Sequence, residues 1–101
     1  MSISVQLSDN GAELIIAVNG RFDFSAHQDF RKSYEDRDPT PETYVIDMTE
    51  TTYLDSSALG MLLLLRDHAG GNDSKITITN VNPDVRKILS ISNFDQLFEI
   101  I

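Results

Sequence analysis

Two hydroxyl groups and a carboxylate stand together near the middle of the chain, at Asp55, Ser56 and Ser57, where a polar segment passes into an apolar one. The apolar segment has the composition of a helix, so these residues are expected at its N-terminus. Free backbone N–H groups and the helix dipole stabilise an anion at such a place, and a serine there can carry a phosphoryl group. Aspartate and serine also cap helices very often, and capping alone is the competing interpretation. Our hypothesis is that Ser57 is a phosphoacceptor.

Phosphorylation of Ser57 is expected to leave the fold intact, because a phosphate at a helix N-terminus stabilises the helix. It would add about two negative charges beside the carboxylate of Asp55. A protein docked on this surface would meet charge repulsion and a desolvation cost. The junction could therefore act as an on/off contact.

The helix that follows Ser57 is more apolar than a surface helix requires. Its apolar residues form two stripes, one of Ala58, Leu62, Leu65 and Ala69, the other of Leu59, Leu62, Leu63 and the stem of Arg66. Only one stripe can face a sheet squarely, so the surplus packs on a neighbouring helix or stays exposed for a partner. Gly60 costs about 1 kcal/mol against alanine in a helix, which close approach of another backbone would explain. We expect a partner to contact Ala58, Leu59, Gly60 and Leu63.

Hydrophobic patterning predicts the elements that position this junction. Alternation predicts a first strand over 3–7 and a second over 14–18, joined at Asn10-Gly11, a strong hairpin sequence. Further strands are expected over 44–48 and 75–79 and at the chain end, with a polar loop over 49–54. Helices are expected to begin at Ser25, which has Gln28 three residues later as in a capping box, at the Asp55–Ser57 junction and at Asn82-Pro83.

The resulting order is β-β-α-β-α-β-α-β. Strands separated by helices pair in parallel through right-handed crossovers. The expected fold is therefore a small α/β sandwich with one mixed, mostly parallel sheet, an antiparallel N-terminal edge hairpin and helices packed on the sheet. Residues 1–101 form a single domain at this length. Functional sites of such sheets lie beyond the carboxyl ends of the parallel strands, where the Asp55–Ser57 junction is expected.

Composition narrows the classes of partner. The chain has 16 acidic and 8 basic residues, a net charge of −8 and no cysteine. An acidic surface repels nucleic acid and anionic lipid, so a protein partner is expected instead. The start of the chain does not resemble a secretory signal, and the longest apolar run, Met61–Leu65, is too short to span a bilayer. We expect a soluble, cytoplasmic protein.

The central stretch resembles the signature of STAS domains, specifically the stand-alone bacterial anti-sigma factor antagonists. The resemblance rests on Val45-Ile-Asp-Met and on Tyr53-Leu-Asp-Ser-Ser-Ala-Leu-Gly60, and it covers nearly the whole chain. In that family the second hydroxyl residue of the motif is phosphorylated, which is Ser57 here. Gly20-x-Phe22-Asp23 resembles a second family motif, which implies that Asp23 lies close to the phosphosite. Ala58 departs from the glycine common in the family.

The resemblance implies partner switching without enzyme activity or cofactor. The unphosphorylated form binds an anti-sigma factor or a similar regulatory kinase, and a serine kinase ends the interaction by phosphorylating Ser57. A metal-dependent serine phosphatase then resets the protein. The protein is on this view a phosphoprotein of signal transduction and transcription regulation.

Two other interpretations remain open from the residues. A receiver-like domain would use Asp47 as phosphoacceptor with Mg²⁺, and Asp23, Asp47 and Asp55 could form an acidic cluster for that ion. It fits poorly, because it needs paired acids after the first strand, where Asp9-Asn10 lies in a hairpin, and no lysine follows the strand that ends at Thr79. Asp47 is more often a strand-end residue that caps or bonds a loop amide. A purely structural subunit is the other interpretation. His27 and His68 are isolated from other metal ligands in sequence and are expected to be structural or exposed.

Overall fold

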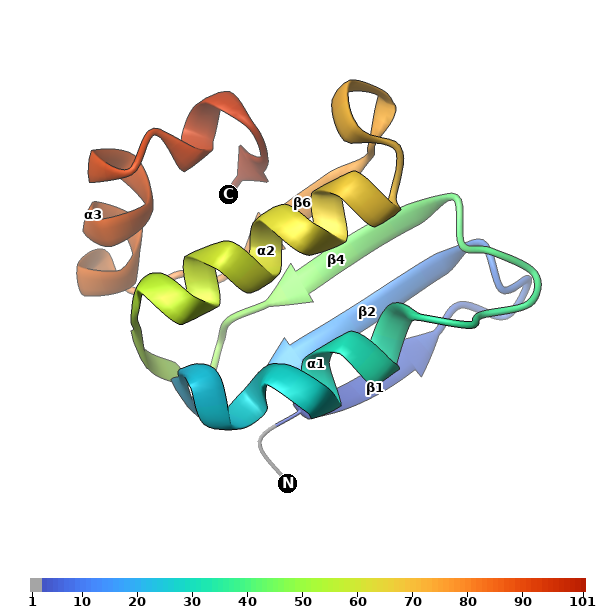
Figure 1. Cartoon of the computed structure of the whole chain (residues 1–101), viewed down its shortest axis with the longest axis horizontal. Helices are drawn as coiled ribbons and strands as arrows, with labels where there is room; N and C mark the ends of the chain where they lie inside the picture. The colour runs from blue at the N-terminus through green and yellow to red at the C-terminus, as the bar shows by residue number, and fades with distance from the viewer. Residues whose placement is uncertain (1–2) are drawn as a thin grey trace.

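A computed structural model describes residues 3–101 and contains a mixed five-stranded sheet (Figure 1). The strand order is β1-β2-β4-β6-β7, in which β1 runs antiparallel to β2 and every other neighbouring pair is parallel. The bounds are Ile3–Leu7 for β1, Glu13–Val18 for β2, Thr43–Asp47 for β4, Ile76–Thr79 for β6 and Glu99–Ile100 for β7. The predicted mixed α/β fold with an antiparallel N-terminal hairpin is confirmed.

Hydrogen bonds within the turn close the β1–β2 hairpin. The Gly11 amide donates to the Ser8 carbonyl at 2.9 Å, and Gly11 has a φ of 72°, which glycine adopts without steric cost. The side chain of Asn10 accepts a hydrogen bond from the Ala12 amide at 3.0 Å. Asn10-Gly11 therefore turns the chain as predicted.

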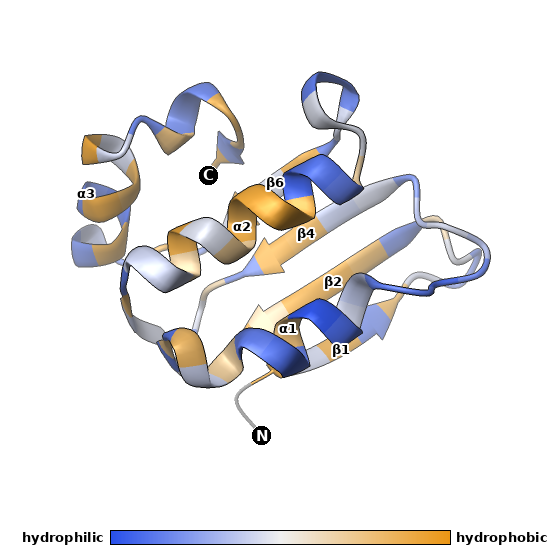
Figure 2. Ribbon diagram, viewed as in Figure 1, coloured by the Kyte–Doolittle hydropathy of each residue, from blue (hydrophilic) through white to orange (hydrophobic). Residues whose placement is uncertain are grey.

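Helices α1 (His27–Tyr34) and α2 (Ser56–His68) lie across the same face of the sheet (Figure 1). Figure 2 shows apolar residues along β2, β4 and much of α2, where the two layers meet. Alternate strand residues point into this core and are buried: Leu14, Ile16 and Val18 on β2, Tyr44 and Ile46 on β4, Ile76 and Ile78 on β6. The period-2 alternation of each strand thus selects the face on which the helices pack.

A short two-stranded parallel ribbon, β3 (Gly20–Phe22) with β5 (Thr51–Leu54), was not predicted. The segment 49–54 was expected to be a polar loop and Gly20–Phe24 a connector, and both expectations are wrong. Exposure along β5 does not alternate, since Thr52 and Tyr53 are both exposed, so no period-2 pattern marks this strand. The ribbon is fixed instead by long-range contacts.

Thr51 supplies one of those contacts. Its side chain is 2% exposed, and its hydroxyl donates to the Val18 carbonyl at 2.8 Å, at the end of β2. The Thr51 carbonyl accepts a hydrogen bond from the Asn82 side chain at 3.0 Å. Thr51 therefore joins the central sheet, the ribbon and the start of the last helix.

Helix α1, which follows β3 in the chain, does not begin at Ser25, so the predicted capping box is wrong. Asp23 accepts the Ser25 amide and caps a 3₁₀ turn over Phe24–Ala26, and α1 follows from His27. Asp23, rather than Ser25, is the capping residue because it lies directly after β3 and has the extended conformation of an N-cap, with φ −134°. Ala26, Phe30 and Tyr34 are buried along one side, as their spacing predicted.

The C-terminal part follows the prediction closely. Asn82 caps α3 (Pro83–Ile91) by accepting the Val85 amide at 2.8 Å. A 3₁₀ turn over Phe94–Gln96 then leads to β7. A turn and a 3₁₀ segment over Gly71–Asp73 separate α2 from β6, and Gly70 and Gly71 have φ values of 117° and 61° there. Within residues 3–101, no helix is long and apolar enough to cross a membrane.

Replacing Thr51 with valine should destabilise the protein by about 1 kcal/mol, because the shape is kept while a buried hydroxyl hydrogen bond is lost. Urea denaturation followed by circular dichroism measures the change. Thr52→Val is the matched control, since Thr52 is exposed on the same strand. Equal effects of the two substitutions would show that the Thr51 hydroxyl does not hold the ribbon.

Candidate functional site

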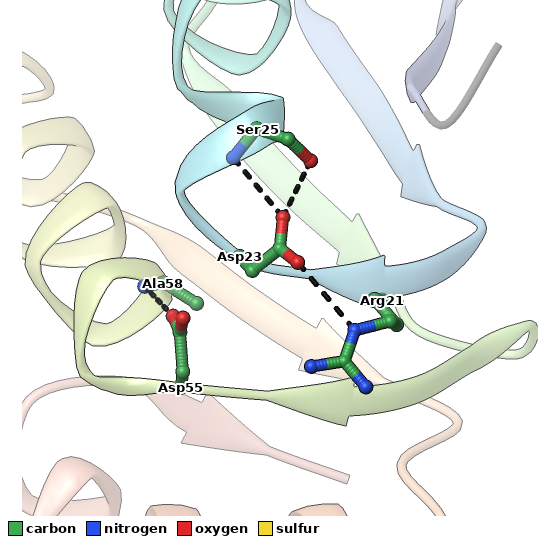
Figure 3. A network of polar contacts seen from close by, with 5 residues as sticks. All are labelled: Arg21, Asp23, Ser25, Asp55 and Ala58. Carbon is green, nitrogen blue, oxygen red and sulfur yellow. Dashed lines mark hydrogen bonds and ion pairs between the residues drawn. The ribbon is translucent and has the colours of Figure 1, made fainter.

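The ends of β3 and β5 bring two carboxylates to neighbouring positions. Phe22 of β3 pairs with Leu54 of β5, and the Asp55 amide donates to the Phe22 carbonyl at 3.3 Å. Asp23 and Asp55 follow these paired residues directly. Figure 3 shows them at the ends of adjacent strands, each turned toward the backbone of its own helical segment.

Asp55 is the N-cap residue of α2. Its Oδ1 accepts a hydrogen bond from the Ala58 amide at 3.0 Å, and its φ of −115° is extended. The cap satisfies one of the first-turn N–H groups that have no partner inside the helix. The capping interpretation of Asp55 is confirmed, and Ser56 becomes the first residue of the helix.

Ser57 is the second residue of α2 and is half-buried, whereas Ser56 is exposed. It lies in the first turn, where the positive end of the helix dipole favours an anion. The helix is 13 residues long, so this dipole is well developed. The position of Ser57 is compatible with a phosphoacceptor role. That role stays a prediction from the sequence.

Asp23 is held by the segment that it caps. Its Oδ1 accepts hydrogen bonds from the Ser25 amide at 3.0 Å and the Ser25 hydroxyl at 2.5 Å, and its Oδ2 lies 3.5 Å from Arg21 Nε. The two Ser25 bonds, with a smaller contribution from Arg21, hold the pKa of the Asp23 carboxyl below its usual range. Asp23 is therefore ionised at neutral pH and adds negative charge beside the N-terminus of α2.

Arg21 is the cation nearest to Asp23. Its guanidinium lies 4.4 Å from the centre of the Tyr53 ring, a cation–π geometry that orients the side chain across the ribbon. Arg21 donates toward Asp23 and leaves the Asp55 cap untouched (Figure 3). The two carboxylates thus have different partners although they lie on neighbouring strand ends.

Of the two predicted apolar stripes on α2, the first faces the sheet. Its residues Ala58, Leu62 and Leu65 are fully buried, and Met61 is buried beside them. Ala58 was predicted to contact a partner, but its side chain is 0% exposed and packs in the core, so it cannot do so. The Ala58 methyl group, which a glycine at this position would lack, is buried in the core.

The outward face of α2 carries exposed apolar side chains around Gly60. Leu63 is 39% exposed and Leu64 is 53% exposed, while Leu59 is partly buried against the core. Gly60 lies three residues after Ser57 and three before Leu63, and helix residues at this spacing are neighbours. A Cβ added at Gly60 would meet nothing within 4 Å, so no packing inside the described chain requires a glycine there.

Sequence reasoning missed two exposed apolar residues near the junction. Leu64 belongs to the apolar run Met61–Leu65 but was assigned to neither stripe of the helix. Phe24 was treated as part of a connector. Phe24 is 70% exposed and stacks on His27, with ring centres 5.5 Å apart. The helical wheel could have found Leu64, because it lies four residues after Gly60, but no pattern marked Phe24.

Asp47 bonds a loop amide, as the structural interpretation predicted. Its Oδ1 accepts from the Thr49 amide at 3.0 Å, the Thr49 hydroxyl at 2.6 Å and the Asn80 side chain at 3.2 Å. The hydrogen bond from the Thr49 hydroxyl is the main reason that the pKa of Asp47 lies below its usual range. All three bonds are made by Oδ1, so this side chain ties the end of β4 to the loop and to Asn80.

Neither histidine takes part in a metal-binding group. Within residues 3–101, no three His, Asp or Glu side chains lie close enough together to hold a metal ion. The ring of His27 stacks on Phe24, and the ring of His68 is tilted against Tyr34 with centres 5.0 Å apart. Both histidines contact aromatic rings, so the expectation that they are structural is consistent with their surroundings.

Replacing Asp55 with alanine should lower the free energy of unfolding by about 1 kcal/mol, because the cap of α2 is lost. Thermal or urea denaturation followed by circular dichroism gives the change. Asp67→Ala removes the same charge from an exposed position near the other end of α2 and is the control. A loss no larger in Asp55→Ala than in the control would contradict the capping role.

Comparison with known proteins identifies relatives along the whole chain. The family model described as Mlab, STAS domain, matches residues 5–100. A STAS-domain containing protein of Pseudomonas aeruginosa (strain UCBPP-PA14) is 61% identical over 100 residues, which cover 99% of each chain.

Solved structures share the fold at low sequence identity. A Thermotoga maritima protein assigned as an anti-sigma factor antagonist superposes with a TM-score of 0.83 at 17% identity, covering 97% of this chain and 84% of that one. The phosphorylated form of SpoIIAA, a Bacillus cell fate determinant, gives a TM-score of 0.75 at 16% identity, covering 98% of this chain and 90% of that one. The unphosphorylated form of the anti-sigma factor antagonist SpoIIAA gives 0.76 at 16% identity, with 98% and 86% covered. The family model and the Pseudomonas relative together show that the chain belongs to the STAS domain family.

Proposed function

We propose that this protein is a non-enzymatic partner-switching regulator whose switch is phosphorylation of Ser57. The observation that carries the proposal is the position of Ser57. It is the second residue of α2, next to an exposed apolar helix face. Structural neighbours described as anti-sigma factor antagonists, one of them known in phosphorylated and unphosphorylated forms, support the same role.

The docking surface is on the outward side of α2 around its middle, formed by Leu59, Gly60, Leu63 and Leu64, which we call the α2 face. Gly60 supports this assignment, because a helical glycine costs about 1 kcal/mol and nothing within the described chain approaches it. A partner that comes close to the backbone at Gly60 would account for it. Ser57 lies one turn before this surface.

Phosphate on Ser57 ends the interaction through charge. The added group carries about two negative charges, and Asp23 and Asp55 already place carboxylates at the same strand ends. The first turn of α2 tolerates the phosphate because the helix dipole favours it. A partner whose apolar centre covers this place would have to bury the phosphate charge, which is costly, while the fold of this protein does not change.

The partner in this proposal is an anti-sigma factor or a regulatory serine kinase, and a metal-dependent serine phosphatase removes the phosphate. The surface is acidic, at a net charge of −8, which favours a protein partner with basic groups around an apolar centre. The protein would act in the cytoplasm, where kinase, ATP and phosphatase meet.

The modification is tested by incubating the protein with its cognate serine kinase and ATP and measuring intact mass. We expect one added phosphate that survives hydroxylamine, that is absent in Ser57→Ala and that remains in the control Ser56→Ala. Ser57→Asp should lose partner binding and keep a native circular dichroism spectrum. A hydroxylamine-labile phosphate would move the modification to an aspartate and contradict the proposal.

The α2 face is tested by Leu63→Glu, which should weaken binding to the proposed partner, the anti-sigma factor or regulatory kinase, about tenfold or more, because a charge replaces apolar contact area. Its free energy of unfolding should change little, since Leu63 is 39% exposed. Ile91→Glu is the matched control, because Ile91 is a 72% exposed apolar residue on α3. Equal affinities of the two variants, measured by isothermal titration calorimetry, would exclude the α2 face as the docking surface.

A further inference from the structure

The free edge of the sheet at β1 lacks a charged side chain, a proline and a bulge within the strand, three features that commonly block edge pairing. β1 has the sequence Ile-Ser-Val-Gln-Leu, without charge or proline, and its pairing with β2 runs without a bulge from Ile3 to Leu7. Natural edge strands are commonly protected by charges, prolines or bulges. Within residues 3–101, β1 pairs on one side only, with β2.

The free backbone groups of this edge belong to Ile3, Val5 and Leu7. The Ser8 amide donates to the Glu13 carbonyl at 2.9 Å and the Glu13 amide donates to the Ser8 hydroxyl at 3.0 Å, so the backbone groups of residues 8 and 13 face each other. Such pairs alternate along antiparallel strands, so Gln6 and Ser4 also bond to β2. The N–H and C=O groups of the three apolar residues therefore point away from the sheet.

The side chains of the same residues leave apolar area beside α1. Val5 is 44% exposed and Leu7 is 43% exposed, whereas Ile3 is buried. The charged residues that line the hollow between β1 and α1 are Asp29, Lys32 and Arg37. These three residues carry one net positive charge in a chain of net charge −8, so the acidic repulsion between two copies is weaker at this edge than over the surface as a whole.

We propose that two copies of this protein associate through β1, antiparallel and centred on Val5. In this register Val5 lies opposite Val5 of the second copy, and Ile3 lies opposite Leu7. Each of these pairs uses the free backbone groups, which exchange both hydrogen bonds. Ser4 lies opposite Gln6 on the other face of the sheet, so the strand is complementary to itself, as a twofold interface requires.

Other registers use the edge less well. A twofold axis through Ser4 or Gln6 leaves one of the three outward-facing apolar residues outside the β1–β1 pairing. A shift by one residue in one copy places outward-facing groups opposite inward-facing ones and forms no ladder. The Val5-centred register alone pairs all three apolar residues.

The interface leaves the α2 face accessible. On the helix-covered face of the sheet, α1 packs against β1 on one side and α2 on the other (Figure 1). The second copy would lie beyond β1, so α1 separates it from Ser57 and Gly60. Dimerisation through β1 therefore does not depend on the proposed switch at Ser57. The dimer would carry two α2 faces, one on each copy.

Charge at position 5 tests both the dimer and its register. Sedimentation equilibrium over a range of protein concentrations should show a monomer–dimer equilibrium for the natural chain. Val5→Lys alone and Val5→Glu alone should each weaken it about tenfold or more, because like charges meet across the axis. Mixing these two variants should restore dimers, while Ser90→Lys, on an exposed position of α3, should dimerise like the natural chain. A monomer at every concentration, or dimers unaffected by either Val5 variant, would overturn the proposal, and failure of the mixture to dimerise would overturn the register.

A cysteine gives a second test that does not depend on charge. The chain has no cysteine, so Val5→Cys introduces a single thiol. Residues opposite each other in a hydrogen-bonded pair have Cα atoms about 5.5 Å apart, within the range that a disulfide spans. Mild oxidation should convert Val5→Cys to a covalent dimer much faster than Ser90→Cys. Equal rates for the two variants would show that position 5 does not meet itself.

Discussion

The pairing of two short strands, β3 and β5, is the constraint on which the proposed site depends. Phe22 pairs with Leu54, and the Asp55 amide donates to the Phe22 carbonyl, so the two following aspartates are placed on neighbouring strand ends. Each aspartate then fixes the start of a helical segment by accepting backbone N–H groups. The position of Ser57 relative to the rest of the fold is therefore set by backbone hydrogen bonds and two caps. This arrangement gives the hydroxyl a defined place without a dedicated cavity.

Two carboxylates near strand ends, Asp23 after β3 and Asp47 at the end of β4, keep their charge over the cellular pH range. Asp23 is ionised well below neutral pH because Ser25 and Arg21 stabilise its charged form, and Asp47 is held ionised by Thr49. Ordinary changes of cellular pH do not titrate these groups. Cellular pH is therefore not expected to change the charge of these two carboxylates, whereas the proposed phosphorylation of Ser57 would change the charge beside Asp23. The proposed phosphate on Ser57 would add its charge at the N-terminus of α2, where the helix dipole favours an anion, which suits a reversible switch.

The fold was predictable where periodicity and turn sequences agree. The β1–β2 hairpin, the α3 cap at Asn82 and the first apolar stripe of α2 follow from patterns within a few residues. The ribbon β3–β5 was not predictable, because its strands are short and held by contacts distant in sequence. Ser25 matched a capping pattern, but Asp23 at the end of β3 is the residue that caps the helical segment. Ala58 was expected to be accessible, but it lies on the side of α2 that packs on the sheet and is buried. The STAS signature did identify the family, and the junction it marks is where the exposed face of α2 begins.

The bonds made by Thr51 bear on the order in which the molecule is assembled. Its hydroxyl reaches Val18, 33 residues earlier, and its carbonyl is bonded by Asn82, 31 residues later. Contacts between such distant segments require loop closure, so the ribbon is expected to consolidate late in folding. On a ribosome, the Asn82 bond cannot form until the segment that becomes α3 has emerged. A kinase that recognises the assembled ribbon would therefore modify finished molecules and pass over nascent chains.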